Sequence, residues 1–496
     1  MTESKAESVT ETEASALAPM FTWAQVIEAT GGKLISQAAS QDLSFGAVST
    51  DTRRPLKGQL FVALKGNQFD AHDFLTQALD QGATGIMVHL DQIALRQKVG
   101  EENWQKYSSR CAFIQVADTL RALQDLAYYW RKGSQFKVVA ISGSNGKTTT
   151  KEYLGQLLEG DLRVHVSPAS FNNHWGVPIS LLQAKSNCEW VVQEMGMNHQ
   201  GELTRLCEIA EPDVAVVTMV GQAHIGELGG QEQVAAAKEE LYLASPQALH
   251  IFNLDNEWTS AMHARAKEKG SKALMTFSGF NASADVCLRA EQMSLAELEV
   301  SGHIAGVEGK ARVPVCGRQN VVNLMAASAA ALAVGMAPER IWAKLPQCQG
   351  SWGRSQLVRL AKGTQVLFDA YNANPESMKA LLNNLYEMPV KGRRVAVLGE
   401  MFELGEAASR LHFELGQAAG LYGLDELWFM GPHWRDFEAG LRSSGFSKNA
   451  VLSEAYEQSL ALKLGSVLNP EDVAIIKGSR AMKMERVLED WQSLAS

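Results

Sequence analysis

Short apolar runs alternate with helix-forming stretches along most of the chain. From residue 136 the runs FKVVAIS, EWVVQE (189–194) and DVAVVTMV (213–220) are continuously apolar, as expected of strands buried on both faces of a parallel sheet. A helix is predicted after the first run, over TTTKEYLGQLLEG, with Gly160 as its C-terminal cap. This alternation predicts a doubly wound α/β core.

The same pattern returns in the last third of the chain. Four apolar runs, each followed by a helical pattern, predict a second, smaller parallel unit: QVLFDA (365–370), RRVAVLG (393–399), DELWFMG (425–431) and DVAIIKG (472–478). The Gly-rich and polar stretch QCQGSWGRSQ (347–356) suits a hinge before it. Earlier in the chain the pattern is mixed, with a helix and strand over 69–88 and a helix over 119–132.

These patterns predict an α/β protein of three domains. Residues 21–117 form a small mixed α/β domain, 118–348 a central domain with a P-loop-type parallel sheet, and 349–496 a Rossmann-like domain. Residues 1–20 are rich in Ser, Thr, Glu and Ala and are expected to be a disordered tail rather than a secretory signal. The apolar stretch 321–337 contains Asn323 and Ser328, which favours a buried alanine-rich helix over a membrane span.

Composition narrows the function classes. The 496 residues carry a net charge of -9, which argues against a general nucleic-acid binder. The six cysteines form no C-x-x-C pair, so neither a zinc ribbon nor a disulfide framework is indicated, and a reducing cytoplasm is expected.

The loop after the first strand, ISGSNGKTT, departs from the usual phosphate loop. The pattern G-x-x-x-x-G-K-[ST] would place a glycine where Ile141 stands, and Gly143 comes two positions later. Gly143 and Gly146 let backbone N–H groups face phosphate oxygens at a helix N-terminus. Lys147 would neutralise the outer phosphates, and the Thr148 hydroxyl would hold Mg²⁺. The alternative is an ordinary glycine-rich turn.

Further polar residues stand where predicted strands end, the edge at which doubly wound sheets bind ligands. Glu194 ends its strand and His224 follows the next one, so they are expected to lie beside the phosphates as ligands of a divalent ion. A capping carboxylate and an ordinary polar histidine are the alternatives. Lys238 lies in QEQVAAAKEELYL, where the pattern alone indicates a solvated helix face.

Two strand ends in the last block carry polar groups. FDAYNANPESM (368–378) places Asp369 and Tyr371 at a strand end before a turn, which could be purely structural. Lys477 and Arg480 follow the last strand, and their charges indicate an anion site or a surface pair.

Together these segments resemble the Mur ligases of peptidoglycan precursor synthesis. That family uses a loop of the form G-x-x-G-K-[ST]-[ST], which GSNGKTT matches in full. The resemblance covers nearly the whole chain after residue 21, in the segments VSTDTRRPLKGQLFVALKG, FNNHWGVPISLL, EMGMNHQGEL, AHIGELGG, AKEEL, GRQNVVNLMAA, YNANPESM, VLGEMFELGEAASRLH and KGSRAMKME. YNANP with KGSR is specific within the family and implies the branch that adds D-alanyl-D-alanine to UDP-N-acetylmuramoyl-tripeptide. ATP and Mg²⁺ would be required, and the enzyme would be a cytoplasmic monomer with small-molecule substrates, no nucleic acid and no membrane insertion.

The resemblance also implies residue roles. ATP would be bound by Gly143, Ser144, Asn145, Gly146, Lys147, Thr148, Thr149, Asn320, Asn323, Arg354 and Asp369. Arg354 would reach the γ-phosphate, and Lys238 falls where family members often carry a carbamylated lysine. The metal ligands would be Thr148, Glu194 and His224. The UDP-sugar would be bound by Ser49, Thr50, Asp51, Thr52 and Arg53, and the dipeptide by Tyr371, Asn372, Asn374, Lys477 and Arg480. For Lys477 and Arg480 the argument is charge rather than family.

One departure and two rival functions remain open at this point. The base-binding segment of the family usually reads H-N-x-x-N, and Gln319 stands at its first position here. A related amide ligase such as a folylpolyglutamate synthase shares the ATP chemistry, but the STDTR and FVALKG segments argue against it. A nucleotide-gated binding protein without ligase activity is a second rival. Release of phosphate that depends on both substrates would distinguish a ligase from it.

Overall fold

The computed structural model describes residues 19–36, 43–66, 69–223 and 225–494. The chain forms two compact units. The first ends at Phe136 and also takes in Asn173–Cys188 and Glu208–Ala210, and the second contains Lys137–Asn172, Glu189–Cys207 and the chain from Glu211 onward. The tail expected over 1–20 lies outside the described residues apart from its last two.

The first unit contains a five-stranded sheet in the order β2-β7-β6-β5-β4. Its strands are parallel except β2 and comprise β2 (Lys33–Leu34), β4 (Ala47–Ser49), β5 (Gln59–Val62), β6 (Gly85–Val88) and β7 (Ala112–Gln115). A two-stranded ribbon pairs β1 (Phe21–Thr22) with β3 (Ser44–Phe45). The helices are α1 (Trp23–Thr30), η1 (Ala71–Phe74), α2 (Leu75–Asp80), α3 (Gln92–Val99), α4 (Glu101–Tyr107), α5 (Thr119–Gly133) and α7 (Gly176–Gln183).

Helix α5 begins where the sequence expects it. The Asp118 carboxylate caps it by accepting hydrogen bonds from the N–H groups of Leu120 and Arg121, as a good N-cap residue does. Its contacts group it with the first unit, whereas the pattern-based boundary preceded it at residue 118.

The second unit begins with a nine-stranded sheet in the order β16-β15-β14-β13-β12-β11-β8-β10-β9. The predicted strands are present as β8 (Lys137–Ser142), β10 (Trp190–Glu194) and β11 (Val214–Val217), and β9 (Val164–Val166), β12 (Leu249–Asn253) and β13 (Leu274–Phe277) extend the parallel sheet. At one edge the sheet continues as an antiparallel meander of β14 (Val286–Met293), β15 (Leu298–Ile304) and β16 (Val307–Val313).

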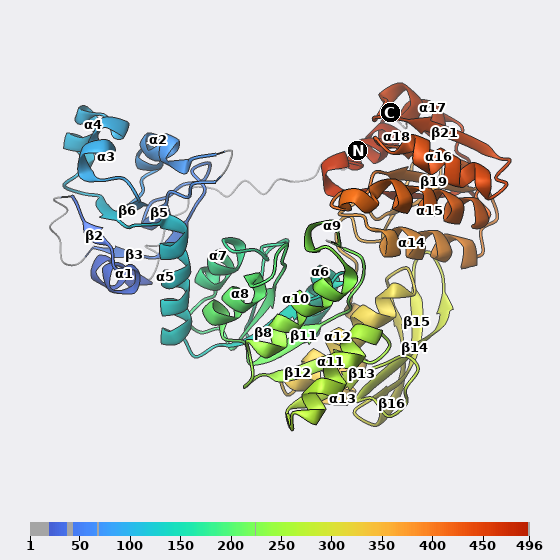
Figure 1. The fold of residues 1–496 in the computed structure, drawn as a ribbon, viewed down its shortest axis with the longest axis horizontal. Helices are drawn as coiled ribbons and strands as arrows, with labels where there is room; N and C mark the ends of the chain where they lie inside the picture. Colours follow the sequence, from blue (N-terminus) through green and yellow to red (C-terminus); the bar gives the residue numbers. More distant parts are fainter. Residues whose placement is uncertain (1–18, 37–42, 67–68, 224, 495–496) are drawn as a thin grey trace. The chain divides into compact units, whose positions relative to one another are not determined.

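Helices flank this sheet (Figure 1). They are α6 (Lys147–Leu158), α8 (Glu202–Ala210), α9 (Ile225–Leu228), α10 (Gln231–Leu243), α11 (Glu257–Glu268), α12 (Gln319–Ala333), α13 (Pro338–Lys344) and η2 (Leu345–Gln347). Helix α12 is the alanine-rich helix that the sequence predicts, and its apolar residues lie in the core beside those of α6. Within the described residues no helix is both long and apolar enough to cross a membrane.

The last block of the second unit is a six-stranded sheet in the order β17-β18-β22-β19-β20-β21. The four predicted strands are β18 (Gln365–Phe368), β19 (Arg394–Gly399), β20 (Glu426–Met430) and β22 (Val473–Lys477); β21 (Asn449–Ser453) is parallel to them and β17 (Gln356–Arg359) is antiparallel. Helices α14 (Pro375–Glu387), η3 (Gly405–Ala407), α15 (Ala408–Leu421) and α16 (Trp434–Ser443) share one core, and α17 (Gln458–Ser466), η4 (Arg480–Met482) and α18 (Glu485–Ser493) lie with the other (Figure 1). The expected α/β fold is confirmed, although antiparallel strands make both larger sheets mixed rather than wholly parallel as the sequence predicts.

Candidate functional site

In the loop between β8 and α6, the backbone lies very close to side chains of other segments. Gly143 and Gly146 have φ values of +144° and +84°, which a side chain disfavours. A Cβ on Gly143 would lie 1.9 Å from the Thr218 hydroxyl oxygen, and one on Gly146 would lie 2.2 Å from Asn323 Oδ1. Thr218 in turn donates to the Asn145 carbonyl at 2.6 Å. Glycine is therefore required at both positions, and the loop is rigidly placed.

A buried carboxylate stands directly beside this loop. Glu194 ends β10, the strand next to β8, and is 1% exposed. Its Oε2 accepts from the Thr148 hydroxyl at 2.6 Å, and its Oε1 accepts from the Asn172 amide at 2.6 Å. The sequence-based expectation that Glu194 meets the loop agrees with this geometry, which gathers several oxygen donors at one point.

Cationic groups surround the carboxylate. Lys147 is half-buried and donates to the Gly143 carbonyl at 2.8 Å. Loss of hydration lowers the pKa of Lys147, and the negative charge of Glu194 opposes part of this shift. Lys151 Nζ lies 4.0 Å from Glu194 Oε2 and donates to the Ser167 carbonyl at 2.7 Å. The loop and β10 thus bring together a largely buried cluster of charged side chains.

Two other loop positions, Ser144 and Thr149, are buried. The Ser144 hydroxyl accepts from the Gly221 N–H at 2.9 Å, and Thr149 is buried in the first turn of α6. These contacts fix the loop against the segment after β11. His224 belongs to that segment but lies outside the described residues, so its expected role as a metal ligand stays a prediction.

Lys238 lies on the inner face of α10 and is 1% exposed. The solvated helix face indicated by its pattern is therefore wrong, because α10 packs this side against β11 and β8. Loss of hydration lowers the pKa of Lys238 well below its ordinary value, and the charge of Lys147 lowers it further. An uncharged amine near the loop is the form that these surroundings favour.

The two asparagines of α12 lie behind the loop. Asn320 Oδ1 accepts from the Tyr153 hydroxyl and from Asn323 Nδ2, both at 3.1 Å, and Asn320 Nδ2 donates to the Cys316 carbonyl. Gln319, the departure from the family pattern, accepts from Asn384 at 2.6 Å and donates to Ser355 at 3.3 Å. Gln319 therefore joins α12 to α14 and to the segment before β17.

Residues of the last block reach the same loop. The Asn374 amide donates to Asn145 Oδ1 at 2.6 Å while its own side-chain oxygen caps α14 by accepting from the Ser377 N–H. The Tyr371 hydroxyl donates to Ser170 at 2.5 Å. The segment YNANP is thus more than a structural turn, because it contacts the glycine-rich loop directly.

Two expected ligand-binding cations have protein partners. Lys477 is 3% exposed, lies 2.7 Å from Asp369 Oδ2 and donates to the Asn372 carbonyl at 2.9 Å. Arg480 pairs with Glu485 at 3.0 Å but remains half exposed at its side chain.

Arg354 lies with its guanidinium 4.2 Å from the centre of the Tyr371 ring, close enough to the loop to lower the pKa of Lys147. Asp369 Oδ1 accepts from the Ser355 N–H at 2.9 Å. The structure therefore brings together the loop, Glu194, Arg354 and the 369–374 segment within the second unit.

The expected UDP-sugar residues lie in the first unit, at the end of β4. The Asp51 carboxylate accepts from the Arg53 backbone N–H and from its guanidinium, at 2.8 to 2.9 Å. These bonds lower the pKa of Asp51 to about 2. The Ser49 hydroxyl accepts from the Asp51 N–H, and the Thr52 hydroxyl donates to the Gln77 side chain. Thr50 is half-buried. The Arg53 side chain is 85% exposed and is open to a ligand anion.

Three contributors were missed from the sequence. Lys151, Ser170 and Asn172 all contact residues of the site. Of the three, Lys151 alone could have been found from the sequence, because it lies one helical turn after Lys147. Asn172 lies in a loop with no motif spacing to Glu194, so its contact depends on the tertiary fold.

Two family models match the chain. The Mur ligase middle domain matches residues 141–331, and the Mur ligase, glutamate ligase domain matches residues 353–480. A curated relative from Bacillus subtilis (strain 168), UDP-N-acetylmuramoyl-tripeptide--D-alanyl-D-alanine ligase, is 31% identical over 94% of this chain and 97% of its own.

Solved structures agree with these matches. The crystal structure of MurF from Acinetobacter baumannii has a TM-score of 0.82 and 30% identity, covering 96% of this chain and all of that one. MurF ligase from Thermotoga maritima, solved in complex with ADP, has a TM-score of 0.75 and 26% identity over 90% of this chain and 97% of that one. Since both family models and full-length relatives match, the chain belongs to the Mur ligase family of ATP-dependent amide ligases.

Proposed function

We propose that this ligase joins D-alanyl-D-alanine to UDP-N-acetylmuramoyl-tripeptide and converts ATP to ADP and phosphate. The substrate assignment rests on the names of relatives that match from end to end. The observation that carries the ATP chemistry is the contact between Thr148 of the glycine-rich loop and the buried Glu194 carboxylate, 2.6 Å apart. Arg354 and the 369–374 segment are polar parts of the last block, and they lie beside the same glycine-rich loop.

The oxygen donors beside the loop fit Mg²⁺. Thr148 supplies a hydroxyl and Glu194 a carboxylate, both of the kind that Mg²⁺ prefers. These two residues would hold the ion, and when bound it would neutralise the charge of the phosphates. We expect Glu194 and His224 to be ligands of a second Mg²⁺ ion.

The first chemical step is phosphoryl transfer to the tripeptide. A carboxylate oxygen of the tripeptide attacks the γ-phosphorus, the bond from that phosphorus to the ADP oxygen breaks, and an acyl phosphate and ADP result. Lys147 at the loop and Arg354 from the last block stabilise the charge on the transferring group. The glycine-rich loop positions the phosphates through its backbone N–H groups.

The second step forms the amide. The uncharged amine of D-alanyl-D-alanine attacks the acyl carbon, the tetrahedral intermediate expels phosphate, and the nitrogen loses a proton. Tyr371, Asn372 and Asn374 would position the dipeptide beside the loop. Both cations have a carboxylate partner, but Lys477 is buried against Asp369 whereas Arg480 is half exposed beside Glu485, so Arg480 is the better partner for the dipeptide carboxylate. Asp369 would then position Lys477 and contact ATP.

Lys238 would act as a carbamate. Attack on carbon dioxide requires an uncharged amine, and burial lowers the pKa of Lys238 toward that form. The resulting anion would lie near Lys147, whose charge it would offset.

The remaining roles follow the three predicted domains. Residues 21–117 would bind the UDP-sugar through Ser49–Arg53, with Arg53 facing a phosphate. Residues 118–348 would bind ATP, with Asn320 and Asn323 toward the base and Gln319 in place of histidine. Residues 349–496 would deliver the dipeptide.

The decisive experiment measures phosphate release with UDP-N-acetylmuramoyl-tripeptide, ATP and Mg²⁺, adding either D-alanyl-D-alanine or single amino acids. We expect release only with the dipeptide, together with a UDP product heavier by the dipeptide less one water. Release with a single amino acid would assign the chain to another amide-forming step. No release with any acceptor would contradict the proposed activity and favour a nucleotide-gated binding protein.

A further inference from the structure

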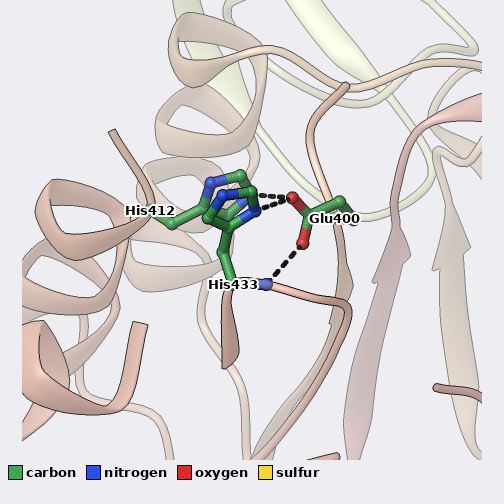
Figure 2. Close-up of side chains that lie close together, drawn as sticks. All are labelled: Glu400, His412 and His433. Atoms are coloured by element: carbon green, nitrogen blue, oxygen red, sulfur yellow. Dashed lines mark hydrogen bonds and ion pairs between the residues drawn. The ribbon is translucent and has the colours of Figure 1, made fainter. Parts of the chain in front are cut away.

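A second polar cluster lies in the last sheet, outside the site described above. Glu400 follows β19 directly, His433 comes three residues after β20, and His412 projects from α15. Figure 2 shows the carboxylate facing both imidazole rings, which lie one over the other. The three side chains therefore meet at the edge where parallel strands end, the usual place for ligands in such sheets.

The donor atoms are close enough to share one ion. Glu400 Oε1 lies 2.5 Å from His433 Nδ1 and 3.2 Å from His412 Nε2, and the three ligand atoms all lie within 4.8 Å of one another. Glu400 Oε2 accepts from the His433 backbone N–H at 3.2 Å, which holds the carboxylate in place. Small side-chain adjustments would open the centre of this triangle to a metal ion.

The hydrogen bonds of His412 fix its tautomer. Its Nδ1 lies 2.8 Å from the Ala408 carbonyl, which only accepts, so Nδ1 carries the hydrogen. Nε2 then bears a lone pair, and it accepts from the Met401 N–H at 3.1 Å. A lone pair 3.2 Å from a carboxylate oxygen is repulsive unless a proton or a metal ion lies between them. A donor bond from the second ring nitrogen to a carbonyl is how metal-binding histidines are usually oriented.

Burial makes a compensating cation more important. Glu400 is 1% exposed and His412 is fully buried, and a carboxylate removed from water is costly unless paired. His433 is half-buried and provides access from solvent. Gly431 has room for no side chain, because a Cβ there would lie 2.3 Å from Glu400 Oε2. The backbone is thus shaped around this carboxylate.

We propose that Glu400, His412 and His433 bind a first-row transition-metal ion such as Zn²⁺. Two imidazoles and one carboxylate suit Zn²⁺, which takes three protein ligands and leaves a position for water. Mg²⁺ prefers oxygen donors and would favour Glu194 and Thr148 instead. The ion would compete with the Met401 N–H for His412 Nε2, so its binding would shift the backbone after β19.

The ion would stabilise the ends of three strands together. Ser479, just after β22, donates its N–H to the Glu400 carbonyl at 3.0 Å, and its hydroxyl accepts from the Phe402 N–H at 2.9 Å. Glu400 and His433 add the ends of β19 and β20. This role is independent of the proposed ligase reaction.

The test is a titration of the full chain, stripped of metals by a chelator, with Co²⁺ in millimolar Mg²⁺. We expect one Co²⁺ per chain with a visible absorption band, displaced by Zn²⁺, and a higher melting temperature in the loaded form. His433→Gln and Glu400→Gln should each weaken binding at least about tenfold. His303→Gln removes an imidazole from β15, where Gln can keep the bond to the Ala282 carbonyl, and should bind as the unchanged chain does.

Two results would overturn the proposal. One is no Co²⁺ band in the unchanged chain, which would leave a hydrogen-bonded Glu–His network. The other is a band that persists at the same affinity in both cluster variants, which would place the ion elsewhere. Circular dichroism checks folding, and His433→Gln is the safer variant because its side chain is half-buried and lies in a loop.

Discussion

Glu194 and Glu400 are two buried carboxylates with the same position in their sheets and different surroundings. Each is 1% exposed and stands where a parallel strand ends, β10 for one and β19 for the other. Glu194 meets a hydroxyl, an amide and a lysine, whereas Glu400 meets two imidazoles. The fold thus presents the same acid at equivalent edges, and the neighbouring donors decide which ion each can hold.

The difference has a chemical consequence. The hard oxygen donors around Glu194 suit Mg²⁺ and phosphate chemistry, while nitrogen donors around Glu400 suit a more tightly held transition metal. Lys147 and Arg354 lie near Glu194 and can stabilise a transferring phosphoryl group. Strand-end geometry alone therefore does not identify a reaction centre, because the cations around it are also needed.

Glu194→Gln should have the largest effect of the substitutions in these two regions. The amide keeps the shape but removes the charge that Lys147 and Lys151 face, so we expect phosphate release to fall by about 10²- to 10³-fold. The measurement is coupled phosphate release at saturating substrates. Glu299→Gln is the matched control, because Glu299 is also largely buried and paired but lies in the β15 meander. Equal rates for both variants would contradict the role of Glu194.

Thr148→Val tests the oxygen donors without changing charge. Valine keeps the volume of threonine and loses the hydroxyl that donates to Glu194 at 2.6 Å. We expect the Mg²⁺ concentration needed for half-maximal rate to rise about 10- to 100-fold, since one supporting donor is lost. Thr259→Val, buried at the start of α11, provides a hydroxyl deletion elsewhere in the same unit. An unchanged Mg²⁺ dependence in Thr148→Val would exclude the hydroxyl as a metal ligand.

Much of the fold can be predicted from the sequence because strands buried on both faces of a parallel sheet have continuously apolar sequences. Strands β8, β10 and β19 are examples, and the loop glycines mark the turn between β8 and α6. The β14–β16 meander was not predicted. Its strands are partly exposed and mix Val286 and Leu288 with Arg289 and Gln292, so the apolar signal is weak.

The candidate site was predictable only where a motif or a strand end marks it. Gly143, Lys147 and Glu194 carry such marks. Lys238 is marked only by the family resemblance; its burial was not predicted, because the charged residues around it suggest solvent although α10 packs that face inward. His412 and His433 were also missed, since a helix and a distant loop bring them together without any fixed spacing.

Lys238→Met removes a buried amine where Glu194→Gln removes a buried acid. The folded-state pKa of Lys238 is well below its ordinary 10.5, so between these values the unfolded chain binds one more proton. The free energy of unfolding should therefore rise with pH by up to about 1.4 kcal/mol per unit in that window, and Lys238→Met should remove this slope. The measurement is melting temperature against pH in buffer depleted of carbon dioxide.

The control for that slope is Lys344→Met. Lys344 is also buried, but it forms an ion pair with Asp161 at 2.5 Å and donates to the Leu157 carbonyl. Its loss should lower the melting temperature while leaving the pH slope in place. The same slope in Lys238→Met and the unchanged chain would mean that Lys238 is charged in the folded state.

Arg53→Ala should have the smallest effect, because it removes an exposed ion pair between the Arg53 guanidinium and the Asp51 carboxylate. Arg53 holds Asp51 in the first unit, but its side chain is 85% exposed and solvent screens the pair, so the melting temperature should barely change. The pKa of Asp51, about 2 beside Arg53, should return toward 3.8. If Arg53 binds the UDP-sugar in both ground and transition states, KM for that substrate rises about tenfold while kcat is retained. Arg54→Ala, the adjacent exposed arginine, is the control. A fall in kcat at unchanged KM would instead link this turn to the reacting groups, and the exposed pair would then resemble Glu194 in function despite its different burial.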